Sequence, residues 1–216
     1  MLKRAAKEDE QTRLVRLGEM EAALRSRGFQ AIAGIDEAGR GPLAGPVVAA
    51  AVILPPELYL LGLNDSKKVS QKNRLRLEAE IQEKALAWGI GEASHQEVDE
   101  INILNATKLA MTRALEALGT QPDYLLLDAV WLDVSLPGEA IIKGDEKAAC
   151  ISAASILAKT YRDRLMEALD IQYPAYGFRK NKGYPTVAHR QAVMDIGPCP
   201  VHRLTFLKFA QKSLEK

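Results

Sequence analysis

Four acidic residues lie at places where a carboxylate could serve chemistry. Asp36 and Glu37 end one apolar segment, Asp128 lies near the end of a second, and Asp145 follows Gly144 just before an expected helix. Taken singly they have ordinary explanations, since Asp36 could be a turn residue and Asp145 a helix N-cap. If they share a site, their oxygen ligands suit a hard divalent cation such as Mg²⁺ or Mn²⁺.

Such a site could hydrolyse a phosphodiester. Two divalent ions about 4 Å apart can activate a water molecule and stabilise the leaving oxygen. Softer ligands look dispersed, because His95, His189 and His202 are scattered along the chain. Cys150 and Cys199 form no Cys-x-x-Cys motif, so zinc is not expected.

The adjacency of Asp36 and Glu37 raises a geometric problem. Neighbouring residues of a regular strand point to opposite faces of the sheet. We therefore expect the backbone to leave regular strand geometry here, helped by Gly39 and Gly41. The hypothesis to check is that all four carboxylates converge on a space wide enough for two ions.

The elements that must position these residues alternate between strands and helices, which predicts an α/β domain with a mixed sheet. Expected strands cover 31–36, 47–54, 87–94, 123–130 and 140–143, and expected helices cover 3–27, 70–85, 97–118 and 146–169. We assign 1–28 to an N-terminal helical extension and 29–216 to the main domain, which includes a basic C-terminal helical segment.

Charge is unevenly distributed along the 216 residues. Residues 171–216 carry a net charge of +6, whereas the preceding 170 residues carry −5. Tyr173, Tyr176, Phe178 and Tyr184 are interleaved with the basic residues. A phosphate-binding surface and a solvated charged tail remain equally possible interpretations.

Other features bound the setting of the protein. No apolar run approaches the roughly 20 residues that span a bilayer, and the N-terminus lacks a secretory signal. The two cysteines fit buried free thiols in a reducing compartment. We expect a cytoplasmic, monomeric protein without membrane association.

Six ordered blocks resemble the type 2 ribonucleases H, in their bacterial form, ribonuclease HII. They are GIDEAGRGPLAGPVVAAAVIL (34–54), DSKK (65–68), the apolar strand ending in Asp128, KGDEKAACISAASILAKTYRDRLM (143–166), YPAYGFRKNKGYPT (173–186) and GPCPVHRLTF (197–206). Since about 30 residues precede them, we expect the ribonuclease HII form and not ribonuclease HIII, which carries an additional N-terminal domain.

The resemblance implies a ribonuclease H-like fold, with a central five-stranded mixed sheet flanked by helices. It implies cleavage of RNA in RNA–DNA hybrids and incision 5′ to single ribonucleotides in duplex DNA, leaving 3′-hydroxyl and 5′-phosphate ends. Asp36, Glu37, Asp128 and Asp145 would hold two Mn²⁺ or Mg²⁺ ions, Asp145 the more loosely.

Substrate contacts are also implied by the resemblance. The backbone of Gly39, Arg40 and Gly41 would read the ribose 2′-hydroxyl that distinguishes RNA from DNA, and Tyr184 would stack on the sugar at the junction. Further residues match positions near the nucleic-acid backbone: Lys67, Lys68, Asn102, Asn105, Thr107 and Lys159. Helix capping is an equally good explanation for the two asparagines, and Ser155 is interpreted as core packing.

Three rival functions use some of the same residues. A nucleotide-binding loop at 39–46 is excluded, since no Lys-Ser/Thr follows the last glycine and two prolines remove amide donors. A junction-cutting nuclease would keep the carboxylates without needing a 2′-hydroxyl reader. A hybrid-binding protein would use the acids only as helix caps.

Overall fold

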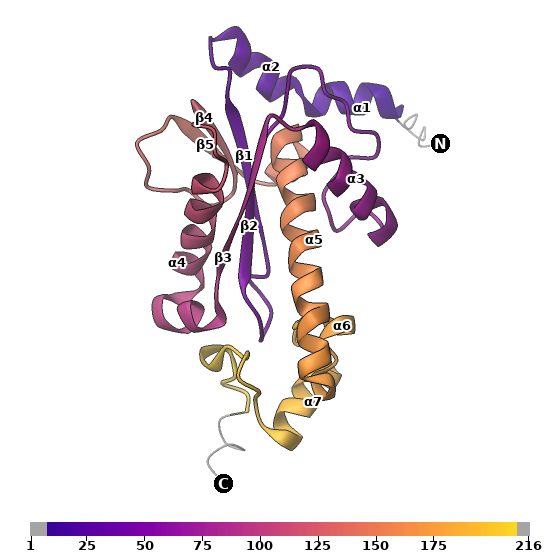
Figure 1. Cartoon of the computed structure of the whole chain (residues 1–216), viewed down its shortest axis with the longest axis vertical. Helices are drawn as coiled ribbons and strands as arrows, with labels where there is room; N and C mark the ends of the chain where they lie inside the picture. Colours follow the sequence, from indigo (N-terminus) through magenta and orange to yellow (C-terminus); the bar gives the residue numbers. More distant parts are fainter. Residues whose placement is uncertain (1–7, 211–216) are drawn as a thin grey trace, which may run out of the picture.

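A computed structural model describes residues 8–210; part of the expected N-terminal helix, as well as Lys212 and Lys216, lies outside this range. One sheet of five strands forms the centre, in the order β3-β2-β1-β4-β5 (Figure 1). The strands are β1 (Ile32–Ala38), β2 (Val47–Ile53), β3 (Ala87–Ala93), β4 (Tyr124–Asp128) and β5 (Gly138–Ile141). Pairing is antiparallel along β1-β2-β3 and parallel along β1-β4-β5, so the predicted mixed five-stranded sheet is confirmed.

Helices cover both faces of the sheet. α5 (Ala149–Gln172) packs on one face and α4 (His95–Glu116) on the other, while α3 (Gln71–Lys84) lies beside α5 (Figure 1). The apolar run of β2 supplies both cores, since Val48, Ala50 and Val52 join the cluster with α5 and the residues between them join the cluster with α4. A continuous apolar strand is what two covered faces require.

Gly34 sets how closely α5 approaches β1. A Cβ atom at this position would lie 2.2 Å from the carbonyl carbon of Cys150 and 2.3 Å from the amide of Ile151. Gly34→Ala should therefore push the helix from the sheet and lower the free energy of unfolding by about 3 kcal/mol. Gly18→Ala is the control for denaturant unfolding, because its nearest atom would lie 3.6 Å away. Equal stability of the two variants would contradict this account.

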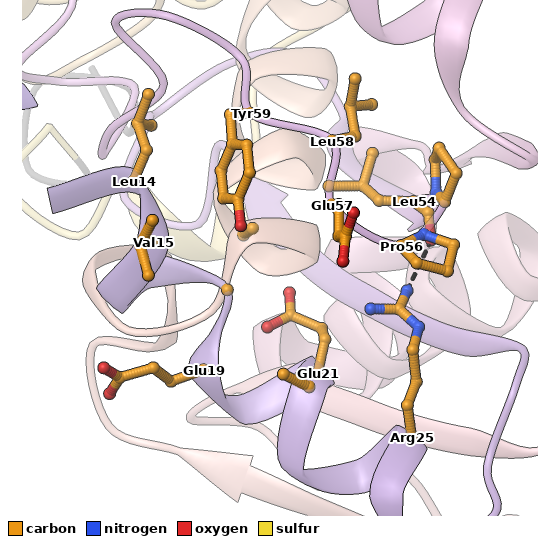
Figure 2. Close-up of a pocket in the computed structure, with 14 residues that line it drawn as sticks. Leu14, Val15, Glu19, Glu21, Arg25, Leu54, Pro56, Glu57, Leu58 and Tyr59 are labelled. Atoms are coloured by element: carbon orange, nitrogen blue, oxygen red, sulfur yellow. Dashed lines mark hydrogen bonds between the residues drawn. The ribbon is translucent and has the colours of Figure 1, made fainter. Parts of the chain in front are cut away.

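The N-terminal addition is packed onto the same core. One helix was expected, but the chain forms α1 (Glu10–Leu17) and α2 (Glu19–Ser26), which meet at Gly18. Leu14, Leu17 and Leu24 are buried in the cluster with α5. The side chains of Glu21 and Arg25 point into a cavity of about 340 Å³ between these helices and the loop after β2 (Figure 2).

Glu21 connects this addition to the main helix. Its buried carboxylate accepts a hydrogen bond of 2.7 Å from the Cys150 amide in the first turn of α5. A carboxylate is favourable there because helix N-termini carry unpaired amides and a partial positive charge. The addition thus caps the start of the helix that follows Asp145.

The C-terminal part wraps around the other end of α5. α6 (Phe178–Asn181) and α7 (Val187–Ile196) join a third apolar cluster with Met166 of α5. The expectation of scattered histidines is wrong for two of them: the Nε2 atoms of His189 and His202 lie 3.0 Å apart in the interior. Both cysteines are buried and free, as predicted. Within residues 8–210 no helix combines the length and hydropathy needed to cross a membrane.

Candidate active site

Parallel pairing of β1 and β4 brings two of the predicted acids together. Ile35 pairs with Leu127, and the residues that follow them are Asp36 and Asp128. Asp36 is only 6% exposed, and its Oδ1 accepts a hydrogen bond of 2.7 Å from the Glu37 amide. Asp128 is half-buried. The sheet therefore presents both carboxylates at one end of adjacent strands.

Glu37 reaches this region without the backbone distortion that we expected. β1 stays regular through Ala38, with Asp36 opposite Ala50 and Glu37 opposite Ala49, so that expectation is wrong. The left-handed backbone begins only at Gly39, with a φ of 96°. Asp36 and Glu37 nonetheless line the same cavity of about 620 Å³. Because the sheet ends here, side chains from either face can reach the space beyond it.

Asp145 lies in a short 3₁₀ turn, Gly144–Glu146, against the end of β4. The Gly144 amide donates to Asp128 Oδ1 over 2.8 Å, which ties the two segments together. Asp145 does not cap α5, whose N-cap is Ala148, so the capping alternative is wrong. Burial, followed by the charges of Asp65 and Asp128, raises the pKa of Asp145 to about 6.

Asp65 is a further carboxylate that the sequence analysis did not assign to the site. It is buried, and its charge is one of the causes that raise the pKa of Asp145. The only signal for it in the sequence was its place in the DSKK block. Its Oδ1 also accepts from the Lys67 amide over 2.9 Å. Asp65 thereby connects the loop that carries Lys67 to the acidic cluster.

Asp36, Glu37, Asp65, Asp128 and Asp145 form an acidic cluster, and several of its members have raised pKa values. Burial, and then the charges of Glu37 and Asp128, raise the pKa of Asp36 well above its ordinary value. Burial also raises the pKa of Glu37, against the opposing effect of Arg40. Burial lowers the pKa of Lys67, but the surrounding carboxylates (Asp65, Asp145, Asp36 and Asp128) outweigh it and raise that pKa.

The donor set fits a hard divalent cation, although the side chains do not form a closed cage. Glu37 Oε2 is buried without a hydrogen-bond partner. The neighbouring groups offer carboxylate oxygens, which Mg²⁺ and Mn²⁺ prefer. Across residues 8–210, no three His, Cys, Asp or Glu side chains are close enough together to hold a metal ion. Convergence of all four predicted acids on two ions therefore stays a prediction.

The rim of the cavity contains the predicted substrate-reading residues. Gly39, Arg40, Gly41 and Tyr184 all line it. A Cβ atom on Gly41 would lie 3.6 Å from Tyr184 Cε1, so this glycine and the aromatic ring face each other. Tyr184 is 42% exposed, which leaves its ring accessible for stacking. Lys67, Lys159, Arg74, Ser66 and Ser155 complete this side of the cavity.

Two buried arginines, which were not assigned to the site from the sequence, hold the loop of residues 39–46. Arg203 donates to the carbonyl oxygens of Gly39, Arg40, Pro42 and Gly45 over 2.7–3.1 Å. Arg162 donates to those of Ala44, Pro46 and Lys182 over 3.0–3.2 Å. Burial lowers their pKa values to about 9 and about 10 respectively, so both stay charged at neutral pH. A Cβ atom on Gly39 would strike the Arg162 guanidinium, which explains this glycine.

Other predicted contacts divide into two groups. Lys159 lines the cavity and pairs with Asp163 over 2.5 Å, and Lys68 is exposed and pairs with Glu146 over 2.6 Å. The core-packing interpretation of Ser155 is incomplete, because its hydroxyl donates to Ser66 Oγ over 2.8 Å at the cavity wall.

The remaining positions lie on α4. Asn102 has a φ of 66° at a kink in the helix, and its side chain accepts from the amides of Leu104 and Asn105, so capping explains this residue. Asn105 is exposed. The predicted substrate contact by Thr107 is wrong. This residue is fully buried and its hydroxyl donates to the Ile103 carbonyl, so it offers no surface to a substrate.

Comparison with known proteins decides the family. A sequence profile described as ribonuclease HII matches residues 33–209, which include every residue of the site. The chain belongs to the ribonuclease HII family. The ribonuclease HII of Syntrophotalea carbinolica is 55% identical over 86% of this chain and 90% of its own length. Ribonuclease HII enzymes are metal-dependent endoribonucleases that act on RNA paired with DNA, and this chain is therefore one as well.

Solved structures give the same fold. The ribonuclease H2 of Pyrococcus horikoshii superposes with a TM-score of 0.71 at 26% identity, covering 85% of this chain and 97% of its own. The ribonuclease HII of Archaeoglobus fulgidus, determined in complex with PCNA, gives 0.70 at 28% identity, covering 86% and 97%. The ribonuclease H-like fold predicted from the motifs is confirmed.

Proposed function

We propose that this ribonuclease HII incises duplex DNA 5′ to a single embedded ribonucleotide, leaving 3′-hydroxyl and 5′-phosphate ends. The observation that carries this proposal is the loop at the cavity rim. Arg203 donates hydrogen bonds to the carbonyl oxygens of Gly39 and Arg40. Within residues 8–210, the amides of Arg40 and Gly41 donate to no protein acceptor, so they are available to a ligand. Fixed amides beside an exposed tyrosine can recognise one ribose.

The acidic cluster supplies the chemistry next to that loop. Asp36, Glu37, Asp128 and Asp145 would hold the divalent ions. When bound, two such ions supply an activated water and neutralise the charge that develops on the phosphate. Mn²⁺ and Mg²⁺ both suit the all-oxygen donor set.

Several residues of the chain would act on the substrate directly. Tyr184 would stack on the sugar at the junction, and the amides at 39–41 would hydrogen-bond its 2′-hydroxyl. Lys67 and Lys159 line the cavity, where their ammonium groups would attract phosphates, whereas Lys68 and Asn105 are exposed residues that do not line it. Substrates of this kind are RNA–DNA hybrids and DNA duplexes that contain ribonucleotides. Cytoplasmic location and a monomeric state remain predictions.

A cleavage assay tests the proposal with three matched duplexes: DNA with one ribonucleotide, a full RNA–DNA hybrid, and all-DNA. With Mn²⁺ or Mg²⁺ we expect a cut on the 5′ side of the single ribonucleotide, no cut in all-DNA, and no activity with EDTA. Binding without cleavage would instead support a hybrid-binding protein. An all-DNA four-way junction serves as a fourth substrate, and equal cutting of that junction would support the junction-cutting alternative.

A further inference from the structure

The two buried histidines of the C-terminal part form a chain of hydrogen bonds that ends on Tyr184. The Cys199 amide donates to His202 Nδ1 over 3.0 Å. The Nε2 atoms of His202 and His189 are 3.0 Å apart, and His189 Nδ1 lies 2.9 Å from the Tyr184 carbonyl oxygen. His189 and His202 are at most 1% exposed.

The two ends of this chain fix its protons. At His202 Nδ1 the Cys199 amide is the closer partner, at 3.0 Å against 3.3 Å for the Cys199 carbonyl oxygen. An amide can only donate, which favours Nδ1 as an acceptor and places the proton of the neutral ring on Nε2. A carbonyl can only accept, so His189 must carry its proton on Nδ1, which leaves its Nε2 as an acceptor. The two deductions are independent, and they agree on one bond, from His202 Nε2–H to His189 Nε2.

The short segment 199–203, which contains His202, also holds the loop at 39–45 on the other rim of the active-site cavity. Arg203, the neighbour of His202, donates to four carbonyls of the loop at 39–45. The backbone joins in as well, with Gly45 donating to the Val201 carbonyl and Arg203 to that of Leu43. The segment therefore connects the 2′-hydroxyl reader to the segment that carries the tyrosine.

We propose that His202 and His189 act as a neutral, hydrogen-bonded pair that positions Tyr184 for stacking on the substrate sugar. They are positioning residues, since neither lines the cavity. The proposal rests on the substrate role proposed above for Tyr184. It requires both rings to be neutral. A proton added to His189 Nε2 would face the N–H of His202 Nε2, and a proton added to His202 Nδ1 would face the Cys199 amide.

The surroundings favour the neutral pair. Burial, followed by the charge of His189, lowers the pKa of His202 to about 4, and burial lowers that of His189. Cys199 on the same segment, Tyr176 against the His202 ring, and His95 and Asp99 from α4 are the other titratable groups that face the pair. The pair should thus be intact at neutral pH and be lost only in acid.

Nuclear magnetic resonance of the full chain with ¹⁵N-labelled histidine tests the pair directly. At pH 7 we expect His202 protonated on Nε2, His189 protonated on Nδ1, and a scalar coupling between their Nε2 nuclei across the hydrogen bond. The opposite tautomers, or a charged ring at pH 7, would overturn the proposal. This measurement does not depend on activity, so failure of the proposed function would appear separately, as correct tautomers without cleavage.

Kinetics with the single-ribonucleotide duplex test the positioning. His189→Leu removes the bond to Tyr184 and should raise KM about fivefold, the effect of one hydrogen bond, with a smaller change in kcat. His189→Asn keeps an amide donor at the position of Nδ1 and should restore most of the loss. Val193→Ala is the packing control, because it truncates a buried side chain of the same helix and cluster. Two results would contradict the positioning role. One is an asparagine variant as impaired as the leucine variant, and the other is a KM of Val193→Ala raised as much as that of His189→Leu.

Discussion

Asp36→Asn should strongly reduce RNA cleavage and, in the absence of metal, make the protein more stable. Asp36 is buried beside Glu37 and Asp128, and burial followed by the charges of these two raises its pKa. An asparagine removes the buried negative charge that the cluster tolerates poorly without a cation. It also removes a ligand for ions worth several kcal/mol of transition-state stabilisation, so kcat should fall by a factor on the order of 10³.

The stability gain should depend on pH in a defined direction. An acid whose pKa is raised on folding stabilises the fold fully below its ordinary pKa of 3.8 and loses that contribution as pH rises through the raised value. Metal-free wild-type protein should therefore lose free energy of unfolding relative to Asp36→Asn as pH rises above about 4. Asp145, present in both proteins, titrates near 6 in the same direction.

Thermal unfolding with EDTA and with Mn²⁺, at several pH values, measures this effect. Mn²⁺ should raise the melting temperature of the wild type and have little effect on Asp36→Asn. Asp133→Asn is the matched control, since its side chain is 82% exposed and pairs with Lys108. The account fails if Asp36→Asn is destabilised without metal, or if it retains wild-type cleavage.

The fold was largely predictable because local patterns and packing agree. The unbroken apolar run of β2 required cover on both faces, and the structure provides α4 and α5. Asp36 and Asp128 could be proposed for one site because each closes an apolar run of the sequence. Their proximity follows from the parallel pairing of β1 and β4, which the sequence left open. The division of the N-terminal helix into α1 and α2 was harder to predict, because the break at Gly18 depends on how the leucines of the two helices fit the core.

Features that depend on distant contacts were not predictable from the sequence. Arg203 looked like one more basic residue of a charged segment, and its role arises only when the C-terminal part folds back on the loop at 39–45. His189 and His202 looked scattered because thirteen positions separate residues whose rings meet. Thr107 matched a surface position in the motif, but the helix turns it into the core.

Arg203→Lys should be the most destabilising conservative substitution at the site. The guanidinium donates to four loop carbonyls from a fixed planar fork, whereas an ammonium has three donors in a compact group and cannot reproduce that geometry. Leaving buried carbonyls unpaired should lower the free energy of unfolding by about 3 kcal/mol.

The same substitution should impair recognition of the ribonucleotide. Without the fork, the loop that presents the Arg40 and Gly41 amides loses its support, and a displacement on the order of 1 Å can reduce catalytic efficiency about 10²-fold. We expect kcat/KM on the single-ribonucleotide duplex to fall by about this factor. Arg179→Lys is the control for both measurements, because its side chain is 65% exposed and pairs only loosely with Asp170, over 3.7 Å. If the two variants unfold at the same denaturant concentration and cut equally well, Arg203 does not support the loop in the way that its hydrogen bonds indicate.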